Sequence, residues 1–217
     1  MTPESVVLEI RARIRHMAEE VVEMTAQALR SVTEGDGERA RMVIQRDAEV
    51  DRQEIEIDRS SYGALAAGHL DAPGLRLVVA SLKTTTDLER VGDESVKLAH
   101  AGLELAVFGS LPEREVLAAL GEVTLSMLHD ATAALAEGDA ERARSVLLRD
   151  DEADRQYRAI ADDVRARMAL DLSALERLVQ VRFAAKCLER IADHATNLAE
   201  QAIFIETGDD VRHLGKR

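Results

Sequence analysis

The sequence has few of the residues from which β-sheets and their turns are built. Aromatic residues make up 2% of its 217 positions, tryptophan is absent, and there are only three prolines and twelve glycines. Sandwiches and barrels need frequent turns and strands rich in aromatic and β-branched residues, so this composition argues against them. Alanine, leucine, glutamate and arginine dominate instead, and these residues favour helices. We expect an all-α fold.

Cysteine, positive charge and long apolar runs are also scarce. The single cysteine, Cys187, cannot form an internal disulfide, which suits a reducing cytosol. Lysine and arginine total 28 against 41 acidic residues, and the net charge of −13 disfavours direct binding to nucleic acid or anionic lipid. No apolar stretch approaches the ~20 residues that span a bilayer, and the first residues show no signal peptide. We expect a cytoplasmic protein that reaches a membrane only through partners.

Glycines and capping residues divide the chain into six long helical segments. Gly35 followed by Asp36 ends one helix and begins the next, and residues 138–139 repeat this signal. Residues 110–113 (SLPE) predict an S-x-x-E capping box at another helix start. Helices this long pack naturally as bundles. The predicted helices cover residues 3–33, 37–67, 73–107, 112–136, 140–168 and 172–206.

The two halves of the chain repeat each other. Residues 34–53 and residues 137–156 are identical at fourteen of twenty positions. A second match, at an offset of 100, aligns residues 88–93 (LERVGD) with residues 188–193 (LERIAD). A period of about 100 residues is too long for a solenoid unit. We therefore expect two tandem homologous three-helix bundles, at residues 1–109 and 110–217, with a linker near residues 108–111.

Pairs of carboxylates recur in register with this repeat. Residues four apart on a helix share one face, with Cβ atoms about 5–6 Å apart. Desolvating such like charges is costly unless they pair with cations or bind a metal. Four carboxylates from two helices make an oxygen site suited to iron, manganese, magnesium or zinc. The candidate metal ligands are Asp47, Asp51, Glu89 and Asp93 in the first bundle and Asp150, Asp154, Glu189 and Asp193 in the second.

An ion-pair network is the main alternative to a metal site. Acid pairs are ordinary on long helices, and arginines lie close in sequence to each pair. Gly92, beside the acids, indicates either a close helix approach or room for an ion. His194 is a weak candidate ligand, and Cys187 is expected to be a buried small apolar residue. No Walker loop, dinucleotide fingerprint or hydrolase motif is present, so the sequence offers no catalytic residues.

Several segments together resemble one known family. Residues 73–76 (PGLR), 82–83 (LK) and 87–93 (DLERVGD) are similar to the P-x-x-L-R … L-K … D-L-E-R-I-G-D signature of the PhoU family. The second half carries residues 188–195 (LERIADHA), followed by residues 197–200 (NLAE). The resemblance covers essentially the whole chain, and the doubled E-R-x-x-D motif is quite specific.

The resemblance implies two similar three-helix bundles that bind multinuclear metal clusters through E(D)-x-x-x-D pairs, here the eight candidate carboxylates. It implies a regulator rather than an enzyme. Members act as negative regulators of the phosphate-starvation response and modulate the phosphate-specific ABC transporter. The expected partners are the ATPase subunit of that transporter and a membrane sensor histidine kinase, and a homodimer is expected. Control of transcription would be indirect, without DNA binding.

Two other functions stay open at this point. A ferritin-like carboxylate-metal oxidase would need a Glu-x-x-His pair within a bundle, and none of the six histidines has a glutamate three residues before it. A helical adaptor without metal would need no such pair. Metal analysis of the purified protein separates this adaptor from a metal-binding regulator.

Overall fold

The computed structural model describes residues 2–212, and within them the chain forms α-helices, one 3-10 turn and no strand. The prediction of an all-α fold is confirmed. None of the described helices is both long and apolar enough to cross a membrane. The first residue of the first predicted domain and residues 213–217 of the second lie outside the described part. The elements are α1 (Pro3–Glu34), α2 (Gly37–Ala67), α3 (Ala72–Ala106), α4 (Arg114–Glu137), α5 (Ala140–Leu147), α6 (Asp150–Met168), η1 (Leu172–Ala174) and α7 (Leu175–Thr207).

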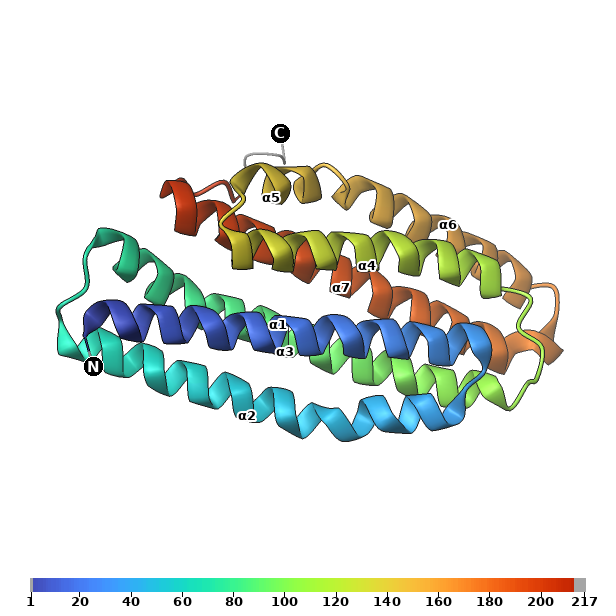
Figure 1. Ribbon diagram of the computed structural model, residues 1–217. Coiled ribbons are helices and arrows are strands. Elements are labelled where there is room, and N and C mark those ends of the chain that lie inside the picture. Colours follow the sequence, from blue (N-terminus) through green and yellow to red (C-terminus); the bar gives the residue numbers. More distant parts are fainter. Residues whose placement is uncertain (1, 213–217) are drawn as a thin grey trace.

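The helices α3 and α7 form the centre of the molecule, side by side and antiparallel (Figure 1). Helix α1 packs on α3, α4 packs on α7, and α1 also contacts α4. These two helices therefore cover one side of the central pair, the side that faces the viewer in Figure 1. Helix α2 completes the first bundle, whereas α5 and α6 together complete the second. The result is the pair of similar three-helix bundles that the repeat predicted.

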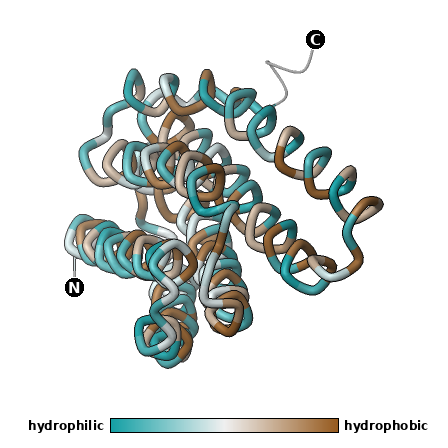
Figure 2. Tube along the Cα trace, turned by 90° about the vertical axis from the view of Figure 1, so that its right-hand side faces the viewer, coloured by the Kyte–Doolittle hydropathy of each residue, from teal (hydrophilic) through white to brown (hydrophobic). Residues whose placement is uncertain are grey.

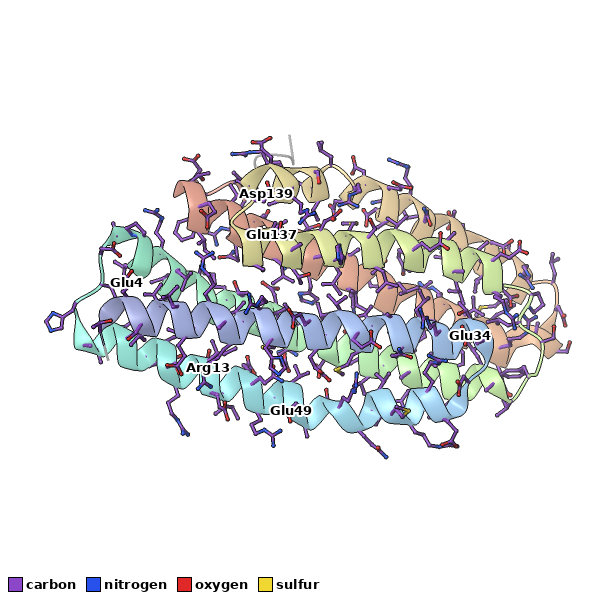
Figure 3. All side chains as sticks on the ribbon, in the orientation of Figure 1. Glu4, Arg13, Glu34, Glu49, Glu137 and Asp139 are labelled. Atoms are coloured by element: carbon purple, nitrogen blue, oxygen red, sulfur yellow. The ribbon has the colours of Figure 1, made fainter. Side chains whose placement is uncertain are left out.

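Local signals fix most helix ends. The side chain of Thr2 accepts a hydrogen bond from the backbone N–H three residues further on, at the start of α1. Asp139 accepts one from the N–H of Arg142 at 2.9 Å at the start of α5 (Figure 3). Gly35 and Gly138 follow α1 and α4 with φ of 72° and 71°, a left-handed conformation that glycine adopts without steric penalty. These repeat-related boundaries confirm the predictions made from the same residues.

The fifth predicted helix, at residues 140–168, is broken in the structure, so its prediction as one segment is wrong. Helix α5 ends at Leu147 and α6 begins at Asp150. Between them, Arg149 reaches across to α4, where its Nη2 lies 2.5 Å from Oδ2 of Asp130. Its Nη1 also donates a hydrogen bond to Oγ of Ser126 at 2.7 Å. The break coincides with a tertiary contact, which explains why no glycine or proline marks it in the sequence.

The capping box predicted at residues 110–113 does not form. Helix α4 begins at Arg114, and the side chain of Glu113 makes no capping hydrogen bond. Glu113 is instead almost fully buried, at 3% exposure, and forms ion pairs with Arg167 and Arg177. The glutamate thus joins the start of α4 to α6 and α7, and a tertiary role replaces the local one.

One hydrophobic core runs through both bundles. Its centre uses repeat-related leucines, since Leu88 and Leu188 are both fully buried. Apolar residues recur in Figure 2 on the sides where the helices face one another. A Cβ atom at Gly92 would lie 3.3 Å from Cγ1 of Val50, so glycine lets α3 approach α2 closely. Close helix packing is therefore sufficient to explain this glycine.

Polar contacts set the register between α3 and α7. Nδ1 of His194 lies 2.9 Å from Oδ1 of Asp87. Further along, Arg190 donates a hydrogen bond to Oε1 of Glu94 at 3.2 Å. From the first contact to the second, the residue number rises on α3 and falls on α7, as in any antiparallel pair. His194 thus has a carboxylate partner in the other bundle, and this contact accounts for it without a metal.

Candidate metal centre

The second bundle brings three of its four predicted ligands together. Asp150 and Asp154 lie on α6, and Glu189 and Asp193 lie on α7. Asp154, Glu189 and Asp193 each offer a carboxylate oxygen, and the three oxygens lie within 4.8 Å of one another. Asp150 has a partner of its own, because Thr196 donates a hydrogen bond to its Oδ1 at 3.1 Å. Four-residue spacing and the packing of α6 on α7 together create this acidic group.

Cations balance part of this charge in the structure. Lys186, one turn before Glu189 on α7, forms an ion pair with it. On α6, Nη2 of Arg158 lies 2.5 Å from Oδ2 of Asp154. Both basic side chains are long and partly exposed, so they can swing away when another cation enters. The group can therefore hold either its own cations or a metal ion.

Asp193 shows how crowded the acids are. Partial desolvation and the nearby negative charges of Glu189 and Asp150 raise the pKa of Asp193 to about 6, although this side chain keeps an exposed part. The cost falls on the charged form, so a proton at Asp193 relieves the repulsion. A metal ion relieves it more strongly, because its charge is larger and it attracts all three carboxylates.

This raised pKa predicts a specific pH dependence of the metal-free protein. The folded state binds the proton of Asp193 more tightly than the unfolded state does. Protonation of Asp193 therefore stabilises the folded state. This stabilisation is fully present below about pH 4, the pKa in the unfolded state, and is lost as the pH rises through the folded pKa of about 6. Asp193→Asn has no such loss. In chelator-containing buffer, the melting temperature of this variant relative to the parent should rise from pH 4 to pH 7.

A neighbouring substitution provides the control for this prediction. Asp151 lies on α6 and is exposed. The melting temperature of Asp151→Asn relative to the parent should stay constant over the same pH range. A constant difference for Asp193→Asn as well would contradict the crowding of charge around Asp193.

The first bundle gathers its predicted ligands less tightly. Asp47 and Asp51 lie on α2, and Glu89 and Asp93 lie on α3. Burial and the charges of Asp51 and Asp93 raise the pKa of Asp47. Burial and the charge of Asp93 likewise raise the pKa of Glu89. Within the described residues, however, these acids form no group of three carboxylate oxygens as close as that of the second bundle.

Basic residues of α3 lie beside the first-bundle acids. Nε of Arg90 lies 3.4 Å from Oε2 of Glu89, and its Nη1 lies 3.5 Å from Oδ2 of Asp93. Nζ of Lys97 lies 3.7 Å from the same oxygen of Asp93. This is the arrangement that the ion-pair alternative requires. Any metal bound here competes with two cations of the same helix.

Glu54 is a member of the first-bundle acids that the sequence reasoning missed. Burial raises its pKa, and Thr86 donates a hydrogen bond to its Oε1 at 3.5 Å. Its negative charge also contributes to the raised pKa of Glu89. The signal was present in the sequence, since Glu54 follows Asp51 by three residues and shares its helix face. The repeat concealed it, because the equivalent position in the second bundle is Tyr157.

Cys187 is buried, as predicted, at 1% exposure. Burial and the charge of Glu94 raise the pKa of its thiol to about 12. A thiol held neutral in this way is a poor nucleophile and a poor metal ligand. Cys187 therefore belongs to the packing between α3 and α7.

The donor atoms of the second bundle fit a hard cation. They are all carboxylate oxygens, which suit magnesium, manganese or iron, whereas zinc favours nitrogen and sulfur donors. Asp154, Glu189 and Asp193 would hold the ion, with water completing its shell. A bound ion would neutralise the repulsion among these acids and link α6 to α7.

Fold and site together define a class of protein: a duplicated all-α protein in which acidic pairs face each other between the second and third helical segments of each bundle. A sequence profile of the PhoU domain matches the chain twice, over residues 14–101 and 117–202. The chain belongs to the PhoU family. The resemblance inferred from the signature motifs is thereby confirmed.

Relatives and solved structures agree with this assignment. The chain is 33% identical over 208 residues to a phosphate-specific transport system accessory protein PhoU homolog of Pseudomonas putida, covering 95% of this chain and 81% of that protein. It is 30% identical over 206 residues to the corresponding PhoU protein of Escherichia coli K12, covering 95% and 86%. The crystal structure of PhoU from Pseudomonas aeruginosa superposes with a TM-score of 0.93 at 29% identity, covering 96% of this chain and 100% of that one. The phosphate transport system regulatory protein PhoU from Streptococcus pneumoniae gives 0.88 at 27% identity, covering 97% and 99%.

Proposed function

We propose that this protein regulates phosphate uptake by a phosphate-specific ABC transporter, and that it acts by binding rather than by catalysis. The observation that carries the proposal is the extent of the similarity. Relatives named as accessory proteins of the phosphate-specific transport system match 95% of the chain, which includes both bundles. The similarity is therefore not confined to a single shared module.

In this proposal the protein is a cytoplasmic adaptor between the ATPase subunit of the transporter and a sensor histidine kinase. It represses the phosphate-starvation response when phosphate is plentiful, and it acts as a homodimer whose protomers consist of units 1–109 and 110–217. The net charge of −13 supports an indirect effect on transcription, because an acidic surface is repelled by DNA. Contact with the membrane goes through the partners.

Metal binding is the second part of the proposal. The second bundle holds iron, manganese or magnesium at Asp154, Glu189 and Asp193, with Asp150 within reach. The close carboxylate oxygens and the raised pKa of Asp193 support this. The first bundle holds metal more weakly, because its described acids do not bring three carboxylate oxygens as close together as those of the second bundle. The ions link the second and third helical segments of each bundle and so stabilise the form that meets the partners.

An adaptor without metal is the alternative function that a specific observation favours. Lys186 and Arg158 already form ion pairs with Glu189 and Asp154. If these pairs persist in solution, the acids need no metal. Elemental analysis of the protein purified without added metal and without chelator distinguishes the two versions, since only the metal-binding regulator retains a transition metal or magnesium.

A deletion experiment tests the regulatory role directly. In the source organism grown with ample phosphate, deletion of the gene should switch on a phosphate-starvation promoter and alter the rate of phosphate uptake. A plasmid copy of the chain should restore repression, while the empty plasmid should not. The purified chain should also retain the ATPase subunit and the cytoplasmic part of the sensor kinase in a pull-down. A promoter that stays silent and an unchanged uptake rate in the deletion strain would refute the proposal.

A further inference from the structure

The two central helices expose the same apolar residues at repeat-related positions. Leu75 and Val79 of α3 are 46% and 40% exposed, and Leu175 and Val179 of α7 are 40% and 47% exposed. The offset of 100 that aligns the two acid motifs also aligns these two pairs. Both bundles thus keep leucine and valine at positions where folding needs no apolar side chain. Repeated exposed apolar residues of this kind are typical of an interaction surface.

Each apolar pair is followed along its helix by basic residues on the same face. On α3, Lys83 lies one turn beyond Val79 and is exposed, with Asp210 of the C-terminal segment near enough to interact with its charge. On α7, Arg182 lies one turn beyond Val179, beside a further exposed apolar residue, Phe183, at 42% exposure. We name Leu75, Val79 and Lys83 the α3 patch, and Leu175, Val179, Arg182 and Phe183 the α7 patch.

An approximate two-fold axis relates the two patches. Glu94 approaches Cys187, while its repeat equivalent His194 contacts Asp87, the repeat equivalent of Cys187. The axis therefore passes between α3 and α7 near the middle of both helices. The N-terminal ends of two antiparallel helices point in opposite directions. The two patches consequently lie at opposite ends of the central pair.

The helix register gives the separation of the patches. Because Asp87 faces His194 and Glu94 faces Arg190, Val179 lies level with the end of α3. About 25 residues of α3 separate this level from Val79, and at 1.5 Å per residue this is about 40 Å. A small domain is only about 30 Å across. One small partner cannot reach both patches, but two copies of a partner can.

We propose that the α3 patch and the α7 patch dock the two subunits of a two-fold symmetric protein dimer, one subunit on each patch. Each subunit presents an apolar side chain next to a carboxylate. The apolar side chain packs on the leucine and valine of the patch, and the carboxylate pairs with the adjoining cation. Each patch alone is much smaller than a stable interface, which buries about 1,200–2,000 Å². Engaging both at once makes the second contact intramolecular and so strengthens binding. The pseudo-symmetry of the repeat is what allows one chain to serve two identical subunits.

Charge argues against the other occupants of these patches. A second copy of this chain stacked face to face would bring Lys83 and Arg182 against one another, and like charges across an interface are repulsive. An anionic membrane would attract these cations but would be repelled by the chain as a whole, whose net charge is −13. A protein dimer with a local acidic and apolar surface meets neither objection.

The inference rests on the proposed function for the identity of the dimer, since an ABC transporter works with a pair of ATPase subunits. The experiment uses the purified ATPase dimer of the phosphate transporter and the full chain. Binding is measured for the parent, for Val79→Asp, for Val179→Asp and for the double variant. Met42→Asp is the matched control, because Met42 lies on α2 and is 62% exposed. Melting curves establish that each variant is folded. Substitutions at these exposed positions should leave the fold intact.

The expected result has two parts. Native mass spectrometry should show one ATPase dimer for each protomer of this chain, so that a homodimer of this chain binds two ATPase dimers. Val79→Asp and Val179→Asp should each weaken binding by roughly 100-fold, the gain that a second linked contact supplies, and by similar factors. The double variant should not bind, and Met42→Asp should bind like the parent.

Other results would overturn the inference in distinguishable ways. If the parent binds the ATPase dimer and the two patch variants bind equally well, the docking surface is wrong and the adaptor function stands. If only one patch matters, the symmetric arrangement is wrong. If the parent does not bind the ATPase dimer at all, the adaptor function fails and this docking fails with it. If the double variant instead loses self-association in analytical ultracentrifugation, or loses binding to vesicles of anionic lipid, while it keeps its affinity for the ATPase dimer, the patches serve that other occupant.

Discussion

Replacing Glu189 by glutamine and Asp193 by asparagine together should abolish the metal-dependent stabilisation of the second bundle. Both changes keep the shape of the side chain and remove its charge. Two of the three close carboxylates are then lost, and Asp154 alone is a weak ligand. In the parent, manganese at about 100 times its Kd should add about 2.7 kcal/mol of stability. For a chain of 217 residues this corresponds to a rise in melting temperature of about 5–10 °C.

The matched control for this prediction lies in the first bundle. Glu89→Gln with Asp93→Asn removes the equivalent pair from an acid group that, within the described residues, brings no three carboxylate oxygens as close together. This variant should keep most of the thermal response at low manganese. Melting curves at increasing manganese, together with elemental analysis, measure both effects. Equal metal content in the parent and in the Glu189 and Asp193 variant would refute the assignment of the second site.

The ion-pair alternative gives a different pattern for the same variants. If Glu189 serves only to pair with Lys186, its neutralisation should leave the metal content unchanged and lower the stability of the metal-free protein. If a metal fills the site, neutralisation should remove the metal and leave the metal-free protein as stable or more stable. The second result is expected above pH 6, because Asp193 is then mostly ionised and its charge is repelled by the neighbouring carboxylates.

Helix ends that depend on neighbouring residues could be predicted from the sequence, and those that depend on distant ones could not. The stops at Gly35 and Gly138 need only a residue that tolerates a positive φ. The break after Leu147 accompanies the contact of Arg149 with Asp130 on another helix. Helical periodicity continues across this break in the sequence, so a local pattern predicts one helix where the structure has two.

The candidate site shows the same limit. The repeat identified the acids, because the spacing of four residues and the offsets of 103 and 100 are visible in the sequence. It could not rank the two bundles, since that depends on how closely α6 packs on α7 and on which cations reach the acids. It also excluded Glu54, whose equivalent is Tyr157. A repeat reveals what two sites share and hides what differs between them. The domain boundary at residues 109–110 and the ligand roles stay predictions.

Substituting Glu113 by alanine should destabilise the protein by about 3 kcal/mol, near the lower end of the range for breaking a buried ion pair. Glu113 is 3% exposed, its Oε1 lies 2.6 Å from Nη2 of Arg167, and it also pairs with Arg177. Burial alone would raise its pKa, but the hydrogen bond from Arg177 and the charges of both arginines hold that pKa below its ordinary value. Alanine leaves Arg177 unpaired, with its side chain only 15% exposed. Arg167 is more exposed, at 37%, and water compensates it in part.

An exposed ion pair and a pH series show whether charge causes this loss. Glu38 pairs with Arg41 at the surface, with its side chain 87% exposed, so Glu38→Ala should cost less than about 1 kcal/mol. Because the folded pKa of Glu113 is depressed, its contribution is present above the unfolded pKa of about 4.5 and is lost as the pH falls through the folded value. Urea unfolding of the parent and of Glu113→Ala should therefore show a large gap at pH 7 that narrows towards pH 3. A gap that does not change with pH would mean that the glutamate stabilises the fold through packing rather than through its charge.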